Sequence, residues 1–105
     1  MIIIFEKDYL RDLYETGKTK DKKHRFQPEI AERYRKRIKT LENAEKIDDL
    51  FFINSLKYEE LKGDKANISS IRVNDKYRVE FTVRYDSIEP LITVCNILEL
   101  SNHYK

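Results

Sequence analysis

The chain has 105 residues, and this length excludes a second domain because two independent cores do not fit in so short a chain. Charged residues make up 38% of it, but apolar residues make up 40%, which suffices for a modest core and argues against disorder. The single Cys95 excludes an internal disulfide and, with two histidines, a structural zinc site of the usual kind. No apolar run approaches the roughly 18 residues that span a bilayer, and residues 1–5 are too short for a signal peptide, so we expect a cytoplasmic protein without membrane contact.

Basic side chains concentrate in two segments of the chain. Residues 17–39 hold ten Lys or Arg against three acidic residues, and residues 62–84 hold six against three. Such a surplus can neutralise the phosphates of a nucleic acid. A charged run around a helix is equally typical of a solvated face, so both interpretations stay open on charge alone.

The first half of the chain predicts a short strand followed by helices. Residues 2–5 are β-branched or aromatic and suit a strand, whereas residues 6–16 carry apolar side chains at helical spacing and stop at Gly17. Pro28 stands at a plausible first position of a second helix. The apolar stripe of that helix consists of Ile30, Tyr34, Ile38 and Leu41.

The segment 47–53 leaves two interpretations open. It is either a short third helix or a turn that fills the core with Leu50, Phe51 and Phe52. Together with residues 2–5 and the first helix, it supplies more apolar surface than so small a core can easily bury, which would suit a protein partner.

The second half of the chain predicts a sheet. From Leu56 onward the apolar period becomes alternating, with strands expected near 56–61, 67–73, 77–84 and 91–100. The connectors are too short for crossover helices, so neighbouring strands should be antiparallel. Residues 1–105 are therefore expected to form a single α+β domain, with two or three N-terminal helices packed on a twisted, mainly antiparallel sheet.

The register of one hairpin follows from its apolar faces. A three-residue loop over 74–76 pairs Ile71 with Val79 and keeps apolar residues opposite one another, whereas a two-residue loop mixes the faces. The longer loop also places Arg72 opposite Arg78 on the face away from the core.

Two arginines at this spacing repel each other by up to about 1 kcal/mol unless an anion lies between them, which suggests a phosphate site. The alternative is that Glu80, two residues along the strand, partly neutralises Arg78 and that the pair points into water.

Four local strings, in this order of elements, resemble the HigB branch of the RelE/ParE superfamily of type II toxins. They are Leu61–Asp64 (LKGD), Ser70–Asn74 (SIRVN), Tyr77–Phe81 (YRVEF) and Asn102–Tyr104 (NHY). The resemblance extends over essentially the whole chain. It implies a cofactor-independent, ribosome-dependent endoribonuclease that cuts mRNA and inhibits translation. It also implies a HigA-like helix-turn-helix antitoxin, through which alone the toxin would meet operator DNA.

The resemblance further implies metal-free cleavage by a small set of side chains. Arg78 would hold the phosphate, because the family has an arginine at this strand position and its planar fork matches phosphate oxygens. His103, with an unperturbed pKa of about 6.5, and Tyr104 would move protons. The expected catalytic residues are Arg78, His103, Tyr104 and Glu59, and the expected RNA-binding residues are Lys62, Arg72, Lys65, Lys76, Arg33 and Arg37.

Two positions depart from the family pattern. Typical members carry His-Pro before the LKGD string and end in Asp-Tyr-His, where this chain has Glu59-Glu60 and Asn102-His103-Tyr104. Glu59 is expected to replace the family histidine as base, and the exchanged order of His103 and Tyr104 to present the same groups in a shifted register. Two alternatives stay open: a ParE-like toxin that binds DNA gyrase without nuclease chemistry, and a catalytically silent relative that acts only as co-repressor with its antitoxin.

Overall fold

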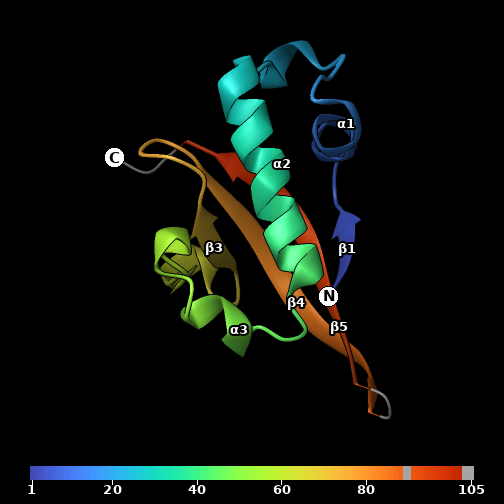
Figure 1. Cartoon of the computed structure of the whole chain (residues 1–105), viewed down its shortest axis with the longest axis vertical. Helices are drawn as coiled ribbons and strands as arrows, with labels where there is room; N and C mark the ends of the chain where they lie inside the picture. Colours follow the sequence, from blue (N-terminus) through green and yellow to red (C-terminus); the bar gives the residue numbers. More distant parts are fainter. Residues whose placement is uncertain (89–90, 103–105) are drawn as a thin grey trace.

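A mixed β-sheet with helices along one side organises the molecule (Figure 1). The computed structural model describes residues 1–88 and 91–102, and within them it contains three α-helices and one five-stranded sheet. The elements in chain order are β1 (Ile2–Phe5), α1 (Asp8–Thr16), α2 (Pro28–Asn43), α3 (Asp48–Phe51), β2 (Glu59–Glu60), β3 (Ser69–Arg72), β4 (Arg78–Ile88) and β5 (Leu91–Ser101). Three short 3-10 turns join them, η1 (Lys22–His24), η2 (Asn54–Leu56) and η3 (Gly63–Lys65).

The strand order is β1-β5-β4-β3-β2. The pairs β2–β3, β3–β4 and β4–β5 are antiparallel, and β1 joins β5 in parallel. The predicted α+β class with a mainly antiparallel sheet is therefore confirmed. None of the helices in the described part of the chain is long and apolar enough to cross a membrane.

Both long helices begin close to their predicted positions, and α1 ends where predicted. Gly17 ends α1 in the left-handed conformation with φ 79°, and its N–H donates to the Leu13 carbonyl at 2.9 Å. A residue with a Cβ would be strained there, which explains why the helix stops at this glycine. Pro28 is the first residue of α2. Proline has no backbone N–H, but at this position no helical hydrogen bond is lost. The buried stripe of α2 consists of Ala31, Tyr34, Ile38 and Leu41, with Ile30 only partly buried beside it.

The segment after α2 forms a helix of a single turn, which decides between the two interpretations of residues 47–53. Leu50 is fully buried, but Phe51 is 51% and Phe52 is 85% exposed. The short third helix is therefore confirmed, and the alternative of a turn that fills the core with all three side chains is wrong. One helical turn directs neighbouring residues to different sides, so only one of the three can point inward.

The predicted hairpin register is confirmed. Ile71 pairs with Val79 and Arg72 with Arg78, and the N–H of Val73 donates to the Tyr77 carbonyl at 2.9 Å. The Asn74 side-chain oxygen accepts the N–H groups of residues 76 and 77 at 2.9 and 2.8 Å and so fixes the three-residue loop.

The strand expected over 56–61 is shorter than predicted. Asn54–Leu56 forms a 3-10 turn, and Lys57 follows in the left-handed region with φ 46°. A non-glycine residue in this region interrupts a strand, so pairing with β3 begins only at Glu59.

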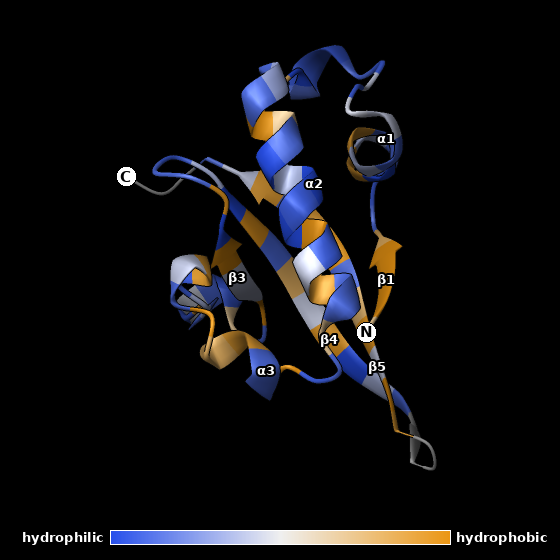
Figure 2. Ribbon diagram, viewed as in Figure 1, coloured by the Kyte–Doolittle hydropathy of each residue, from blue (hydrophilic) through white to orange (hydrophobic). Residues whose placement is uncertain are grey.

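The core lies between the sheet and the two long helices. Figure 2 shows apolar positions alternating with polar ones along β4 and recurring at intervals along α2. Two buried tyrosines tie the layers together: the Tyr34 hydroxyl donates to the Leu10 carbonyl at 2.8 Å, and the Tyr9 hydroxyl accepts the Leu100 N–H at 3.3 Å. Burial raises the pKa of Tyr9 to about 12 and also raises that of Tyr34.

These tyrosines predict how stability depends on pH. Above the ordinary tyrosine pKa of 10.0, the unfolded chain loses phenolic protons that the folded chain retains, so stability falls as the pH rises from there towards the folded values. Tyr34→Phe should cost about 1 kcal/mol at neutral pH through the lost buried hydrogen bond, and should make the alkaline decline shallower. Urea unfolding at neutral pH and at about pH 11 measures both; an equally steep decline in the variant would contradict the assignment.

Candidate functional site

The polar candidate residues gather on the face of the sheet that lies opposite α1 and α2. The row Ile71, Val79, Leu100 points into the core, so the rows next to it point to the other side, which we call the second face. Directly paired residues on one face have Cβ atoms about 4.5–5.5 Å apart. The second face carries one row of Glu59, Ser70, Glu80 and Glu99 and an adjacent row of Arg72, Arg78 and Ser101.

Arg78 is the centre of this face. It is 8% exposed, its Nε donates to the Ser70 hydroxyl at 2.7 Å, and its Nη2 donates to the Ser70 carbonyl at 3.2 Å and to the Lys57 carbonyl. The left-handed conformation of Lys57, which costs about 1 kcal/mol, belongs to the turn that presents this carbonyl. The guanidinium is thus held in a fixed orientation by β3 and by the turn before β2.

Glu80 is the buried acid of the second face. It is 2% exposed, and the Lys65 Nζ donates to its two carboxylate oxygens at 3.1 and 3.0 Å. Lys65 comes from η3, the turn formed by the LKGD string, where Gly63 has φ 68°. The string therefore has a structural consequence, because its left-handed glycine turns the chain so that Lys65 reaches Glu80.

These contacts correct one expectation about the cross-strand pair Arg72 and Arg78. Arg72 is partly exposed, but Arg78 is buried, so the interpretation in which the pair points into water is wrong for Arg78. Glu80, the residue expected to neutralise Arg78, is buried as well. A charge in this position must be matched by hydrogen bonds and opposite charge, and Ser70 and Lys65 supply part of that match. The role of Ser70 was not predicted, and its signal was a pair of small hydroxyl residues at 69–70 between the apolar residues Ile68 and Ile71.

Three of the predicted RNA-binding arginines meet at the β3 side of the molecule. The Arg37 Nε donates to the Arg72 carbonyl at 2.8 Å, which joins α2 to the end of β3. The pKa of Arg37 is lowered by burial first and then by the charges of Arg72 and Arg33. Arg72 also forms an ion pair with Asp75, and Arg33 with Glu29 at 3.7 Å. We call Arg33, Arg37 and Arg72 the arginine edge.

Glu59 and Glu60 occupy opposite faces of β2. Glu59 pairs with Ser70 and so shares the second face with Arg78, whereas Glu60 pairs with Ser69 on the core side. Both glutamates are exposed. Glu59 is thus the exposed carboxylate one strand away from the serine that holds Arg78.

The remaining predicted residues separate into two groups. Lys62, before η3, and Lys76, in the loop between β3 and β4, are exposed. His103 and Tyr104 lie outside the described residues. The predicted catalytic set is therefore placed only for Arg78 and Glu59.

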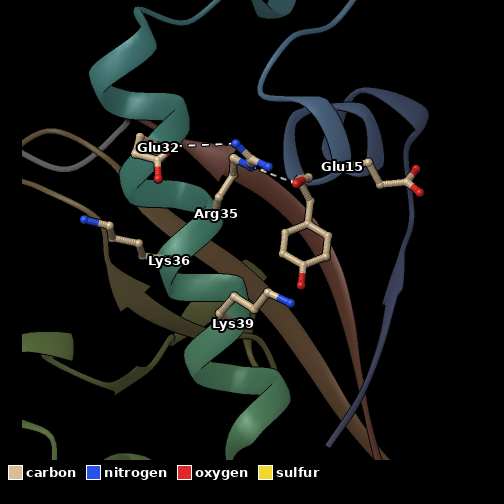
Figure 3. A pocket seen from close by; sticks show the side chains of 6 residues that line it. Glu15, Glu32, Arg35, Lys36 and Lys39 are labelled. Atoms are coloured by element: carbon tan, nitrogen blue, oxygen red, sulfur yellow. Dashed lines mark hydrogen bonds and ion pairs between the residues drawn. The ribbon is translucent and has the colours of Figure 1, made fainter.

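A separate pocket of about 480 Å³ lies between α1 and α2 (Figure 3). Its lining residues are Tyr14, Glu15, Glu32, Arg35, Lys36 and Lys39. Arg35 already forms two contacts within the pocket: its Nε donates to the Tyr14 carbonyl at 2.9 Å, and its Nη1 donates to Glu32 at 3.5 Å. This pocket is on the helix side of the sheet and does not include the residues of the second face. Among the described residues, no group of three or more His, Cys, Asp or Glu side chains is placed to hold a metal ion.

Comparison with known proteins gives a consistent result. The solved structure of a YoeB/ParE toxin from Agrobacterium tumefaciens matches 99% of this chain and 100% of that chain with a TM-score of 0.63 and 18% sequence identity, which supports the shared fold. No curated protein sequence matches the chain. The model of the HigB-like toxin family, described as RelE-like toxins of type II toxin-antitoxin systems, matches residues 3–92. This chain therefore belongs to the HigB-like family of type II toxins, and its biological partner is an antitoxin.

Proposed function

We propose that this toxin is a ribosome-dependent endoribonuclease that cleaves mRNA without a metal ion. The observation that carries the proposal is the second face, where the fixed cation Arg78 and the exposed carboxylate Glu59 flank Ser70. Positive charge and a carboxylate on the same face of the sheet are what phosphodiester cleavage by general base catalysis needs. RNA supplies its own nucleophile, the ribose 2′-hydroxyl.

In the proposed reaction Glu59 takes the proton of the 2′-hydroxyl. The 2′-oxygen then bonds to phosphorus, the bond from phosphorus to the 5′-oxygen breaks, and the products are a 2′,3′-cyclic phosphate and a 5′-hydroxyl. The negative charge that accumulates on the phosphate oxygens is stabilised by nearby cations. His103 or Tyr104 protonates the leaving 5′-oxygen, a role that rests on the family resemblance.

The proposal divides the work of the cations. Arg78 donates from Nε and Nη2 to protein acceptors, which fixes the position of its guanidinium. In this proposal it contributes its positive charge to the site and keeps Ser70 in place. Arg72, its cross-strand neighbour, and the exposed Lys62 are more accessible for direct contact with a phosphate. Lys65 belongs to the same region through its ion pair with Glu80.

The RNA beyond the scissile phosphate is proposed to follow the arginine edge. These side chains extend from α2 to the end of β3, where the exposed Lys76 adds a further charge. A cationic strip of this kind binds phosphates without reading sequence, as expected for contact with ribosomal RNA and mRNA. The antitoxin is proposed to be HigA-like and to supply all contact with operator DNA.

The first test compares two arginines on the same strand. Arg78 and Arg84 both belong to β4 and lie six positions apart, so their side chains leave the strand on the same face, but Arg84 is exposed and forms an ion pair with Asp86. Arg78→Ala should abolish cleavage, by about 100-fold or more, whereas Arg84→Ala should retain it. The measurement is primer extension on mRNA translated by purified ribosomes with each protein.

Folding of the variants must be checked independently because Arg78 is buried. Binding to the antitoxin and the urea midpoint provide this check, and Arg78→Lys, which keeps the charge but loses the fork on Ser70, replaces the alanine variant if that one unfolds. Cleavage retained in a folded Arg78 variant would contradict the proposal. Growth arrest with intact messages would instead indicate a non-nuclease toxin such as a gyrase binder, and no arrest would indicate a silent relative.

The second test uses the two neighbouring glutamates of β2. Glu59→Gln removes the proposed base without changing its size, so cleavage should fall by about 100-fold while binding to the ribosome persists. Glu60→Gln removes the same charge from the opposite face and should cleave like the wild type. Single-turnover cleavage and ribosome co-sedimentation separate the chemical step from binding; equal effects of the two variants would exclude Glu59 as the base.

A further inference from the structure

A pocket of about 580 Å³ lies on the core side of the sheet, where β4 extends past the end of α2 (Figure 1). Its walls combine two tyrosines, one carboxylate and an apolar group, namely Tyr58, Tyr85, Glu60, Ile47, Leu61 and Val83. Glu60 pairs with Ser69, and Ser69 pairs with the fully buried Phe81. Because side chains alternate along a strand, this pocket is on the face opposite to Glu59 and is separate from the proposed cleavage site.

The two tyrosines present aromatic surface to the pocket in different ways. The Tyr58 hydroxyl shares a hydrogen bond of 2.8 Å with the Ser69 hydroxyl, and the Phe51 ring lies 4.9 Å from the Tyr58 ring between centroids. Tyr85 is 60% exposed on β4. One ring is therefore held in place by its neighbours, while the other is open to a ligand. Tyrosine is a residue type that binding surfaces favour.

Glu60 gives the pocket a negative charge that this chain does not match. In the described part of the chain, its carboxylate has no ion pair and no side-chain hydrogen bond, and no Lys or Arg lines the pocket. Its charge also acts on the nearby ring, because the pKa of Tyr58 is raised first by burial and then by the charge of Glu60. The pocket thus joins a free carboxylate to aromatic rings.

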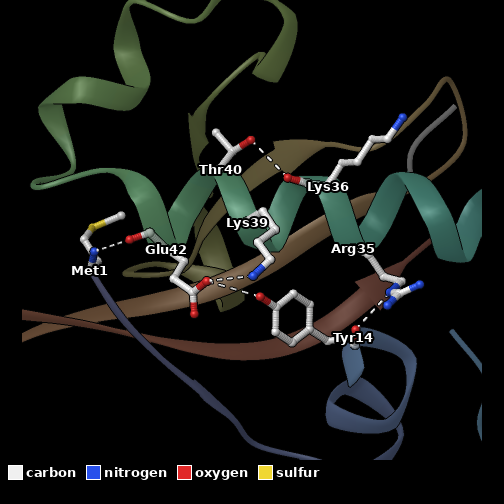
Figure 4. A network of polar contacts seen from close by, with 7 residues as sticks. All are labelled: Met1, Tyr14, Arg35, Lys36, Lys39, Thr40 and Glu42. Atoms are coloured by element: carbon white, nitrogen blue, oxygen red, sulfur yellow. Dashed lines mark hydrogen bonds and ion pairs between the residues drawn. The ribbon is translucent and has the colours of Figure 1, made fainter. Parts of the chain in front are cut away.

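The pocket between α1 and α2 shows the opposite condition. Figure 4 shows Lys39 donating to the Glu42 carboxylate at 3.4 Å and the Tyr14 hydroxyl donating to the same carboxylate at 3.2 Å. Arg35 likewise donates to the Tyr14 carbonyl. The contacts of that pocket are satisfied within the chain, so it does not require an external charge.

The segment that frames the pocket at Glu60 indicates the sign of its ligand. Residues 40–61 hold six acidic residues against two lysines, whereas residues 17–39 hold ten Lys or Arg against three acids. Nucleic-acid phosphates are attracted to the second segment and repelled by the first. The pocket is therefore suited to a cation.

We propose that this pocket binds an arginine side chain that a basic segment of a partner protein presents. The guanidinium plane stacks on the tyrosine rings, and its N–H groups donate to the Glu60 carboxylate. The methylene stem of the arginine lies along Ile47, Leu61 and Val83. Lysine is the poorer ligand, because its ammonium has neither the planar face nor the fork of donors.

The inference does not rest on the nuclease chemistry proposed above. It needs neither RNA nor the residues of the second face, and it is tested by binding alone. Arginine binding in a toxin that does not cleave mRNA would contradict only the proposed function.

Nuclear magnetic resonance titration with a blocked Gly-Arg-Gly peptide tests the site. The amides of residues 58–61 and 83–85 should shift, while those of Arg72 and Arg78, on the second face, stay unchanged. The same peptide with citrulline, which is similar in size but neutral, should bind about tenfold more weakly. Equal affinity of the two peptides would overturn the proposal. Pocket shifts with adenosine monophosphate but not with the arginine peptide would indicate a nucleobase site and would overturn it too.

Variants of the exposed side chains separate charge from stacking. Glu60→Gln should weaken binding of the arginine peptide by about tenfold, whereas Glu59→Gln, on the opposite face of β2, should bind it like the wild type. Tyr85→Leu should weaken binding by about threefold, and Tyr85→Phe, which keeps the ring, should not. Equal effects within either pair would overturn the proposal. Pocket shifts that depend on toxin concentration without peptide would indicate a second copy of this chain as the occupant and would also overturn it.

Discussion

The buried guanidinium of Arg78 is the constraint on which the second face depends. A charge that is 8% exposed is tolerated only where hydrogen bonds replace its hydration, so the chain around it must deliver acceptors at fixed places. Ser70 does so from the neighbouring strand, and the Lys57 carbonyl does so from a turn in a left-handed conformation. Because these partners are 8 and 21 residues away in sequence, the arginine links β4 to β3 and to the segment before β2. It thereby sets the position of Glu59, two residues beyond that turn.

A second buried contact closes the same segment from its other end. Lys65 reaches Glu80 from η3, so residues 57 and 65 are both tied to β4 and enclose β2 between them. The two contacts have opposite chemistry, since one buries a cation against neutral oxygens and the other buries a carboxylate against a partly exposed ammonium. Their combination keeps the local charge close to balance. This explains how a sheet can hold Arg78 and Glu80 below its surface on the side opposite the helices.

Sequence reasoning succeeded where the physical signal is local. The end of α1 at Gly17, the start of α2 at Pro28 and the register of Ile71 with Val79 follow from one residue type or one alternation, and all three are confirmed. It left residues 47–53 open between a short helix and a turn that fills the core, because whether Phe51 and Phe52 are buried depends on the direction of a single helical turn. The hydrogen bonds from Arg78 to Ser70 and to the Lys57 carbonyl were not predictable from the sequence either, since a backbone carbonyl carries no sequence signature. The candidate site was therefore predictable as a set of charges on one face, but not as a network.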